Sequence, residues 1–152
     1  MPLNPGDSPG FLLWHATLRW QRAIASALIP LRLTHVQFVL LACAWWLNTR
    51  GEHPNQLTLA RHAGTDVKMA SQVLRTLESK GLIEREVDRA DTRAKRLRVT
   101  SLGADLAPRA IAAVEHVDAQ FFRPVPLDDT LALLGRLAHP NPETPIEISA
   151  TS

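Results

Sequence analysis

Four polar side chains near the middle of the chain have types and spacing suited to hydrogen bonding with nucleic acid. They recur at intervals of three and four residues, on one face of a helix: Lys68, Ser71, Gln72 and Arg75. Amide, hydroxyl and cationic groups of this kind bind base edges or phosphates when their helix lies in the major groove. We expect Ser71, Gln72 and Arg75 to read bases. We expect Lys68, and Thr65 just before the helix, to contact phosphate.

Two short helices separated by a sharp turn are expected to position these side chains. The first contains an apolar set at helical spacing: Leu59, Ala60 and Ala63. Gly64 follows where a helix ends in a left-handed residue, and Asp66 is a good N-cap for the second helix. The second helix has an inward apolar stripe: Ala70, Val73, Leu74 and Leu77. Lys80 and Gly81 form a favourable helix end.

A β-hairpin with a basic second strand is expected after this helix. Residues 82–87 and 95–100 alternate between apolar and polar side chains, as strands with one buried face do. The connection, residues 88–94, contains no glycine and is longer than a tight turn, so we expect a mobile loop. Basic residues without an intervening acid follow: Arg93, Lys95, Arg96 and Arg98. The helix pair, polar face and basic hairpin together predict a reader of duplex DNA.

The run from Gln56 to Gly103 resembles the winged helix-turn-helix of the MarR (multiple antibiotic resistance regulator) transcription factors. Residues 77–85, Leu-Glu-Ser-Lys-Gly-Leu-Ile-Glu-Arg, resemble the exit of the family's recognition helix. Asp91-Thr92-Arg93 followed by residues 97–103, Leu-Arg-Val-Thr-Ser-Leu-Gly, resembles its wing. With the flanking helices, the resemblance covers residues 10–137. It implies a mainly α fold with a small β-hairpin wing, and an obligate dimer on pseudo-palindromic operators, usually a repressor released by a small molecule or by oxidation.

The wing is expected to add further DNA contacts. Arg93 at its tip would enter the minor groove, and Asp91 would orient that side chain. Lys95 and Arg96 would contact the DNA backbone, and Arg89 belongs to the same predicted surface. If two protomers pair, their recognition helices would lie ~34 Å apart in successive major grooves, and the operator would be an inverted repeat.

Composition and charge agree with a single soluble domain over residues 1–152. The chain is 45% apolar and 21% charged, and its net charge is +2. Residues 61–98 hold ten Lys or Arg and six Asp or Glu, so positive charge is concentrated on the predicted DNA-reading unit. The longest apolar run, residues 38–47, is far shorter than the ~20 residues of a membrane span. With no secretory signal at the N-terminus, we expect a cytoplasmic protein without a membrane partner.

Helices are expected on both sides of this unit. Residues 9–28 form a first helix that Pro30 ends, and Thr34 with Gln37 has the spacing of a capping box. Residues 36–47 are apolar on every side, which predicts a helix that is buried all round. A long helix over residues 101–122 carries a seam close to a heptad: Leu102, Leu106, Ala110, Ala113, Val117 and Phe121.

A last short helix is expected over residues 127–137. We expect residues 10–30 and 101–137 to form the dimer, with residues 34–100 as the DNA-binding region. In the alternative, the seam packs within the monomer. Residues 139–152 have the composition of a flexible tail.

A small-molecule site is expected where the dimerisation helices meet the reading domain, because the resemblance places effector pockets there. A basic stripe on the first helix and rings elsewhere are its candidate residues: His15, Arg19, Arg22, Ser26, His35, Trp45, Trp46 and His116. Charge-assisted hydrogen bonds and stacking would suit an aromatic or phenolic anion. The alternative is a solvated basic face beside an ordinary aromatic core.

Other functions have weaker support. Cys43 lies in an apolar run, which raises a thiol's pKa, so core packing is favoured over a redox switch. Gly6-Asp7-Ser8-Pro9-Gly10 matches a serine-hydrolase pattern, but Pro9 has no N–H for an oxyanion hole. No metal-site or phosphate-loop spacing occurs, so we expect neither an enzyme nor a cofactor or metal. A winged helix that binds only protein, or packs for stability alone, fits the polar face and basic wing less well.

Overall fold

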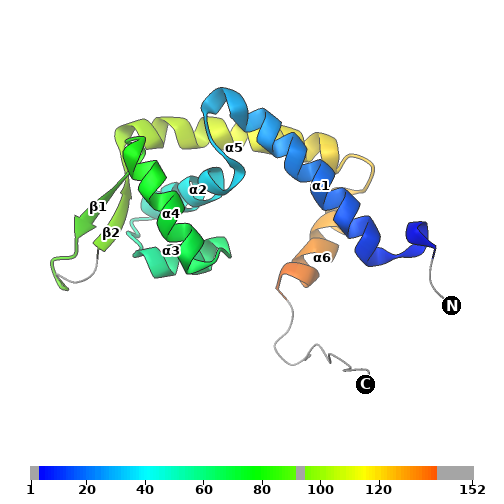
Figure 1. The fold of residues 1–152 in the computed structure, drawn as a ribbon, viewed down its shortest axis with the longest axis horizontal. Coiled ribbons are helices and arrows are strands. Elements are labelled where there is room, and N and C mark those ends of the chain that lie inside the picture. The colour runs from blue at the N-terminus through cyan, green and yellow to red at the C-terminus, as the bar shows by residue number, and fades with distance from the viewer. Residues whose placement is uncertain (1–3, 92–94, 140–152) are drawn as a thin grey trace, which may run out of the picture. The chain divides into compact units, whose positions relative to one another are not determined.

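The computed structural model describes residues 4–91 and 95–139, and it is mainly helical with one two-stranded antiparallel hairpin (Figure 1). In chain order the elements are η1 (Pro5–Asp7), α1 (Pro9–Leu28), η2 (Ile29–Leu31), α2 (His35–Thr49), α3 (Gln56–Ala63), α4 (Val67–Ser79), β1 (Ile83–Val87), β2 (Lys95–Val99), α5 (Ser101–Phe121) and α6 (Leu127–Ala138). The winged helix fold expected from the sequence is confirmed. The chain divides into two compact units, Met1–Val117 and Asp118–Ser152.

The predicted capping box at the start of α2 is present. The Thr34 hydroxyl accepts from the Gln37 backbone N–H at 3.2 Å, and Gln37 Oε1 accepts from the Thr34 N–H at 3.1 Å. The prediction that this helix is buried all round is wrong. Its buried face is a single stripe, Leu40, Leu41, Ala44 and Leu47, whereas Trp46 is 44% exposed. Large apolar side chains cover the full circumference of α2, but neighbouring elements pack on only part of it.

The helix pair of the DNA-reading unit has the predicted limits. Asn55 caps α3, accepting from the Thr58 N–H at 2.8 Å, and Gly64 ends it in the left-handed conformation with φ of 70°. Asp66 caps α4 by accepting from the Met69 N–H at 3.0 Å. The inward stripe of α4 is confirmed, because Ala70, Leu74 and Leu77 are all fully buried.

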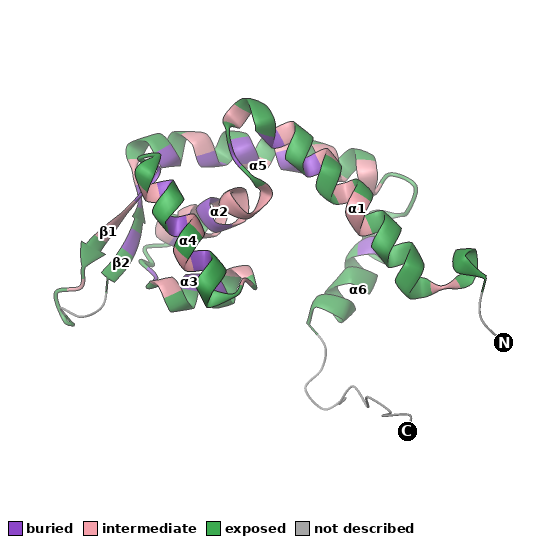
Figure 2. Ribbon diagram, viewed as in Figure 1, coloured by how far each residue is buried: buried purple, intermediate pink, exposed green. Residues whose placement is uncertain are grey.

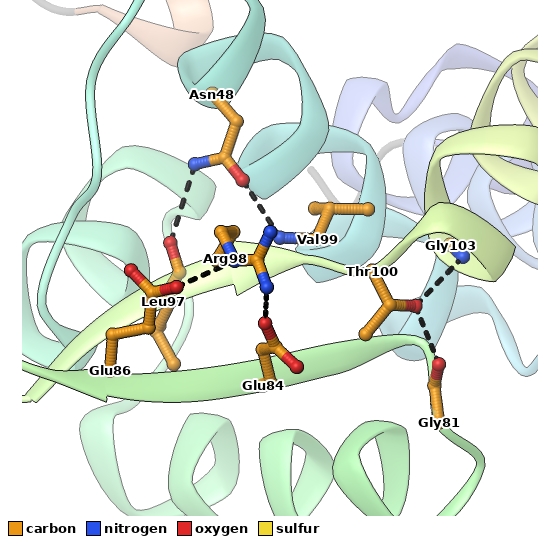
Figure 3. Close-up of polar contacts among 9 residues, drawn as sticks. All are labelled: Asn48, Gly81, Glu84, Glu86, Leu97, Arg98, Val99, Thr100 and Gly103. Carbon is orange, nitrogen blue, oxygen red and sulfur yellow. Dashed lines mark hydrogen bonds and ion pairs between the residues drawn. The ribbon is translucent and has the colours of Figure 1, made fainter.

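The hairpin is fastened to α2 by one side chain. Asn48 Nδ2 donates to the Leu97 carbonyl at 3.3 Å, and Asn48 Oδ1 accepts from the Val99 N–H at 2.8 Å (Figure 3). On the same strand the Leu97 N–H donates to the Pro54 carbonyl at 2.8 Å. Within the hairpin Ile83 pairs with Val99. The strand β2 is therefore hydrogen bonded to β1 on one side and to the α2–α3 region on the other.

The long helix α5 faces the core with small residues. Its buried positions are Gly103, Ala107, Ala110 and Val114. Of the seam that we expect to pair with a second copy, Ala110 is fully buried within the chain and Leu102 is 58% exposed, so the pairing of this seam between protomers stays a prediction. A Cβ on Gly103 would lie 2.2 Å from the Leu82 carbonyl oxygen, so this approach requires glycine.

The second unit contains α6, which is exposed over most of its length (Figure 2). Its buried residue is Thr130, whose hydroxyl donates to the Pro126 carbonyl at 3.2 Å. The exposed leucines of this helix are Leu127, Leu131, Leu133, Leu134 and Leu137. The predicted flexible tail, residues 139–152, lies outside the described residues except for His139.

Within residues 4–91 and 95–139, no single helix is long and apolar enough to cross a membrane. The segments Pro9–Leu31 and His35–Thr49 reach the required length and hydropathy only when combined, and they bend by 72° where they join.

Candidate nucleic-acid interface

The outer face of α4 carries the side chains predicted to read DNA. Lys68, Gln72 and Arg75 are exposed and Ser71 is half-buried, while the opposite face packs into the core. Thr65, in the turn before the helix, is half-buried, and its hydroxyl donates to the Ala60 carbonyl at 3.4 Å. The five residues predicted for this helix and turn thus lie on α4 and the turn directly before it, although their contacts with DNA stay predictions.

A hollow of about 490 Å³ separates α4 from the hairpin. Its lining residues are Arg75, Glu78, Ile83, Glu84, Arg85 and Lys95. Arg75 and Lys95 come from different elements and both line it, so two cations predicted to contact DNA share one concave surface. The lining holds three cations and two acids, and this small excess of positive charge favours a polyanion through the local electrostatic potential.

An ion pair that the sequence analysis missed holds the recognition helix against the hairpin. Arg85 Nε of β1 lies 2.9 Å from Glu78 Oε1 of α4, and Arg85 Nη1 donates to Gln56 Oε1 of α3 at 3.3 Å. Both charged side chains are partly buried, which screens the pair less than a surface pair. Arg85 therefore links three elements, and its charge serves the fold.

Two basic residues of β2 also bind within the protein. Arg98 forms ion pairs with Glu84, and with Glu86 at 2.7 Å, across the hairpin (Figure 3). Arg96 Nε lies 2.8 Å from Asp88 Oδ2, and Arg96 Nη1 donates to the His53 carbonyl at 2.8 Å. Because these two arginines pair with acidic side chains, the hairpin surface is less positive than the run of basic residues in the sequence indicates. Lys95 is exposed, and the phosphate contact predicted for Arg96 stays a prediction.

The start of the wing loop is organised by Asp88. Its carboxylate accepts from the Ala90 N–H at 2.9 Å and from Arg96. The Ala90 hydrogen bond, followed by the Arg96 hydrogen bond, lowers the pKa of Asp88 from its ordinary value. Arg89 and Asp91 are exposed. Arg93 lies outside the described residues, so its minor-groove role, and that of Asp91 in orienting it, stay predictions.

The residues predicted to bind an effector take part in several separate contacts. His35 forms an edge contact with Trp20 at 5.0 Å between ring centroids, whereas Trp46 stacks on His62 at 5.6 Å. His35 and Trp46 lie at opposite ends of α2, which separates them by roughly 16 Å along the helix axis. Arg50 lies 4.6 Å above the Trp46 ring.

The remaining candidates lie on three helices. His15, Arg19, Arg22 and Ser26 are exposed on α1, Trp45 is half-buried on α2, and His116 is exposed on α5. The ring contacts of His35 and Trp46 described above do not bring these two residues into one pocket. The binding of an effector by the candidate residues stays a prediction.

Cys43 packs as the sequence analysis favoured. It is half-buried on α2, against the hydrophobic core. Burial raises the pKa of the Cys43 thiol, which lowers the fraction of reactive thiolate. Among the described residues there is no group of three or more His, Cys, Asp or Glu arranged to hold a metal ion.

A recognition helix with a polar face, preceded by a short helix and followed by an anchored hairpin, defines a winged helix-turn-helix DNA-binding protein. A sequence profile of the MarR family matches residues 33–95. The chain is 45% identical over 119 residues to the HTH-type transcriptional regulator YdcH of Bacillus subtilis, covering 78% of this chain and 81% of YdcH. It is 32% identical over 115 residues to the HTH-type transcriptional repressor Rv2887 of Mycobacterium tuberculosis, covering 75% and 80% of the two chains.

Solved structures of similar fold agree with this match to the MarR family. CouR from Rhodococcus jostii, solved with bound p-coumaroyl-CoA, has a TM-score of 0.79 at 26% identity, covering 92% of this chain and 98% of CouR. MepR from S. aureus, solved with DNA, has a TM-score of 0.75 at 21% identity, covering 86% and 94%, and supports the fold. The chain belongs to the MarR family and is a DNA-binding transcriptional regulator. This family consists of transcriptional regulators, which agrees with the expectation that the chain is not an enzyme.

Proposed function

We propose that the protein is a dimeric repressor that binds an inverted-repeat operator and that a small organic anion releases it from DNA. The observation that carries the proposal is the hollow between α4 and the hairpin, whose lining includes both Arg75 and Lys95. If α4 entered a major groove, Arg75 would lie toward the base edges and Lys95 toward the DNA backbone. The relative Rv2887 is described as a repressor, which supports the direction of regulation.

Exposed apolar side chains support a second copy of the chain as partner. On α1 the exposed residues include Phe11, Leu12, Leu13 and Trp14, and on α6 the leucines described above are exposed. Large apolar side chains exposed in such numbers on one helix are typical of protein interfaces. Both helices belong to the segments predicted to form the dimer. A two-fold pair would present two copies of α4, which explains the need for an inverted repeat.

Release by an organic anion is supported by similarity to CouR, the structure of which contains p-coumaroyl-CoA. The alternative of a redox switch at Cys43 is disfavoured because the thiol is half-buried and its pKa is raised. The alternative of a purely protein-binding module is disfavoured by the polar, cationic outer face of α4. A cytoplasmic location stays a prediction.

The direct test is a gel-shift titration of the full chain with the intergenic DNA upstream of its own gene. We expect a specific complex that resists excess random duplex. Arg75→Ala should lose about 1–3 kcal/mol of operator binding and relax base preference. Arg123→Ala, an exposed arginine of the second unit, is the matched control and should bind as wild type does. Equal binding by the Arg75→Ala variant would reject this assignment.

A further inference from the structure

The first turn of α4 exposes two large apolar side chains. Val67 is 42% exposed and Met69 is 48% exposed, and they flank Lys68 in the sequence. Further along the same helix, Leu74 and Leu77 are fully buried. In helix-turn-helix proteins the N-terminal residues of the recognition helix are the ones that contact base edges. The two exposed apolar side chains therefore lie on the part of α4 that would come closest to the bases.

Helix geometry places Met69 beside a side chain that is predicted to read bases. Residues three positions apart on a helix are neighbours on its surface, so Met69 lies next to Gln72. Thr76 follows on the same side, and its hydroxyl donates to the Gln72 carbonyl at 3.3 Å, within the helix. Val67 precedes Met69 by two residues, which places it on nearly the opposite side of α4. Met69, unlike Val67, thus shares the side of the helix that carries Gln72.

The N-cap of α4 makes the first turn a poor site for a phosphate group. The Met69 N–H is one of the backbone donors with which a helix N-terminus can bind an anion. In this structure the Asp66 carboxylate accepts from that N–H at 3.0 Å. Its negative charge would also repel a phosphate group at short range. A contact between the Met69 side chain and a base is therefore favoured over a contact between its backbone and phosphate.

Thymine is the base that matches an apolar side chain in the major groove. It presents a C5-methyl group there, whereas adenine presents the N6 donor and the N7 acceptor that a glutamine amide can bind together. The unbranched thioether of methionine is flexible and polarisable, so it adapts to a small apolar partner. An A·T base pair offers both features on one edge, which suits the neighbouring side chains of Gln72 and Met69.

We propose that Met69 determines base specificity by contacting the C5-methyl group of a thymine in each operator half-site, in the A·T pair whose adenine Gln72 reads. The proposal rests on the proposed function and deepens it, because it adds a base preference that polar contacts alone do not provide. Burial of one methyl group against Met69 corresponds to about a fourfold gain in affinity for each half-site.

The test replaces each thymine of one half-site in turn with deoxyuridine, which removes the C5-methyl group and retains base pairing. The probe is the shortest intergenic duplex that the full chain binds specifically, and affinity is measured by fluorescence anisotropy. We expect wild type to bind one of the substituted duplexes about fourfold more weakly. Met69→Ala should bind the thymine and deoxyuridine forms of that duplex equally. Met69→Leu keeps an apolar side chain and should retain most of the difference.

Two neighbouring variants serve as matched controls. Val67→Ala shortens the apolar side chain on the other side of the helix, and Lys68→Ala removes the predicted phosphate contact in the same turn. Both should keep the fourfold difference between the two duplexes, although Lys68→Ala should bind every duplex more weakly. Met69→Ala should melt at the same temperature as wild type, because the Met69 side chain is about half exposed and is not part of the core.

Several outcomes would overturn the proposal. Wild type could bind all the deoxyuridine duplexes as tightly as the unmodified operator, or Met69→Ala could keep the full difference. Loss of the difference in Val67→Ala and not in Met69→Ala would assign the methyl contact to Val67. Each of these results leaves operator binding intact, so it rejects the role of Met69 alone. Failure of wild type to prefer the operator over random duplex would reject the proposed function, and this proposal with it.

Discussion

Gly103, at the start of α5, lies so close to Leu82 that a Cβ at residue 103 would be 2.2 Å from the Leu82 carbonyl oxygen and 2.7 Å from a methyl group of Val99. Neither the backbone oxygen nor the strand that carries Val99 can move without disturbing the hairpin. The junction between α5 and the wing thus requires a residue without a side chain at position 103.

Gly103→Ala should therefore destabilise the protein, although alanine is normally the better helix former. We expect a loss of about 1–3 kcal/mol in the free energy of unfolding, the usual range for overpacking, measured by urea denaturation. The control is Gly135→Ala in α6, where an added Cβ meets no described atom within 4 Å. That change should stabilise by up to about 1 kcal/mol through helix propensity. An unaltered midpoint for Gly103→Ala would show that the junction tolerates a Cβ.

Asn48→Ala should loosen the wing, because it removes both hydrogen bonds between α2 and β2. We expect faster hydrogen exchange of the Val99 amide and a loss of about 1–3 kcal/mol in stability. Asn48→Asp retains an acceptor for the Val99 N–H but loses the donor to the Leu97 carbonyl, so it should protect the Val99 amide better than alanine does. Equal exchange rates in wild type and Asn48→Ala would contradict this anchoring role.

The pKa of Asp88 should lie below the ordinary value of an aspartate when it is measured by carboxyl NMR titration. A carboxyl pKa that is lower in the folded than in the unfolded state stabilises the fold above the unfolded value. That contribution disappears as the pH falls through the folded pKa. Arg96→Gln should raise the pKa only partly, because the Ala90 N–H still donates to the carboxylate. An ordinary pKa in wild type would reject the hydrogen-bonded loop start.

Lys95 and Arg98 should contribute differently to DNA binding despite their proximity in β2. Lys95 is exposed beside the hollow, whereas Arg98 pairs with Glu84 and Glu86. Lys95→Ala should weaken binding to all duplexes and reduce the slope of log affinity against log salt by about one. Arg98→Ala should change that slope less, as followed by fluorescence anisotropy across a salt series. A larger effect of Arg98→Ala would show that DNA displaces its intramolecular partners.

The first and last residues of the helices were the features predicted best from the sequence. Thr34, Gln37, Gly64 and Asp66 act through local capping geometry, which depends on neighbours in the chain. The inward stripe of α4 was also predicted, because apolar and polar residues separate cleanly around that helix.

Features that depend on partners distant in sequence were predicted less well. The face of α5 that packs within the chain was not predicted, because small residues such as Gly103 enter the core by permitting close approach, and their low hydrophobicity gives no signal in the sequence. The pairing of Arg98 with Glu84 depends on strand register, which alternation alone does not determine. The acidic residues of the first strand and the basic residues of the second strand could have indicated this pairing.

The proposed function requires two copies of α4 to read an inverted repeat, and sedimentation velocity on a labelled operator duplex measures that stoichiometry. We expect two protomers per duplex, and roughly 100-fold weaker binding when one half-site is replaced by random sequence. One protomer per duplex, or an affinity that is unchanged by replacing the half-site, would contradict it.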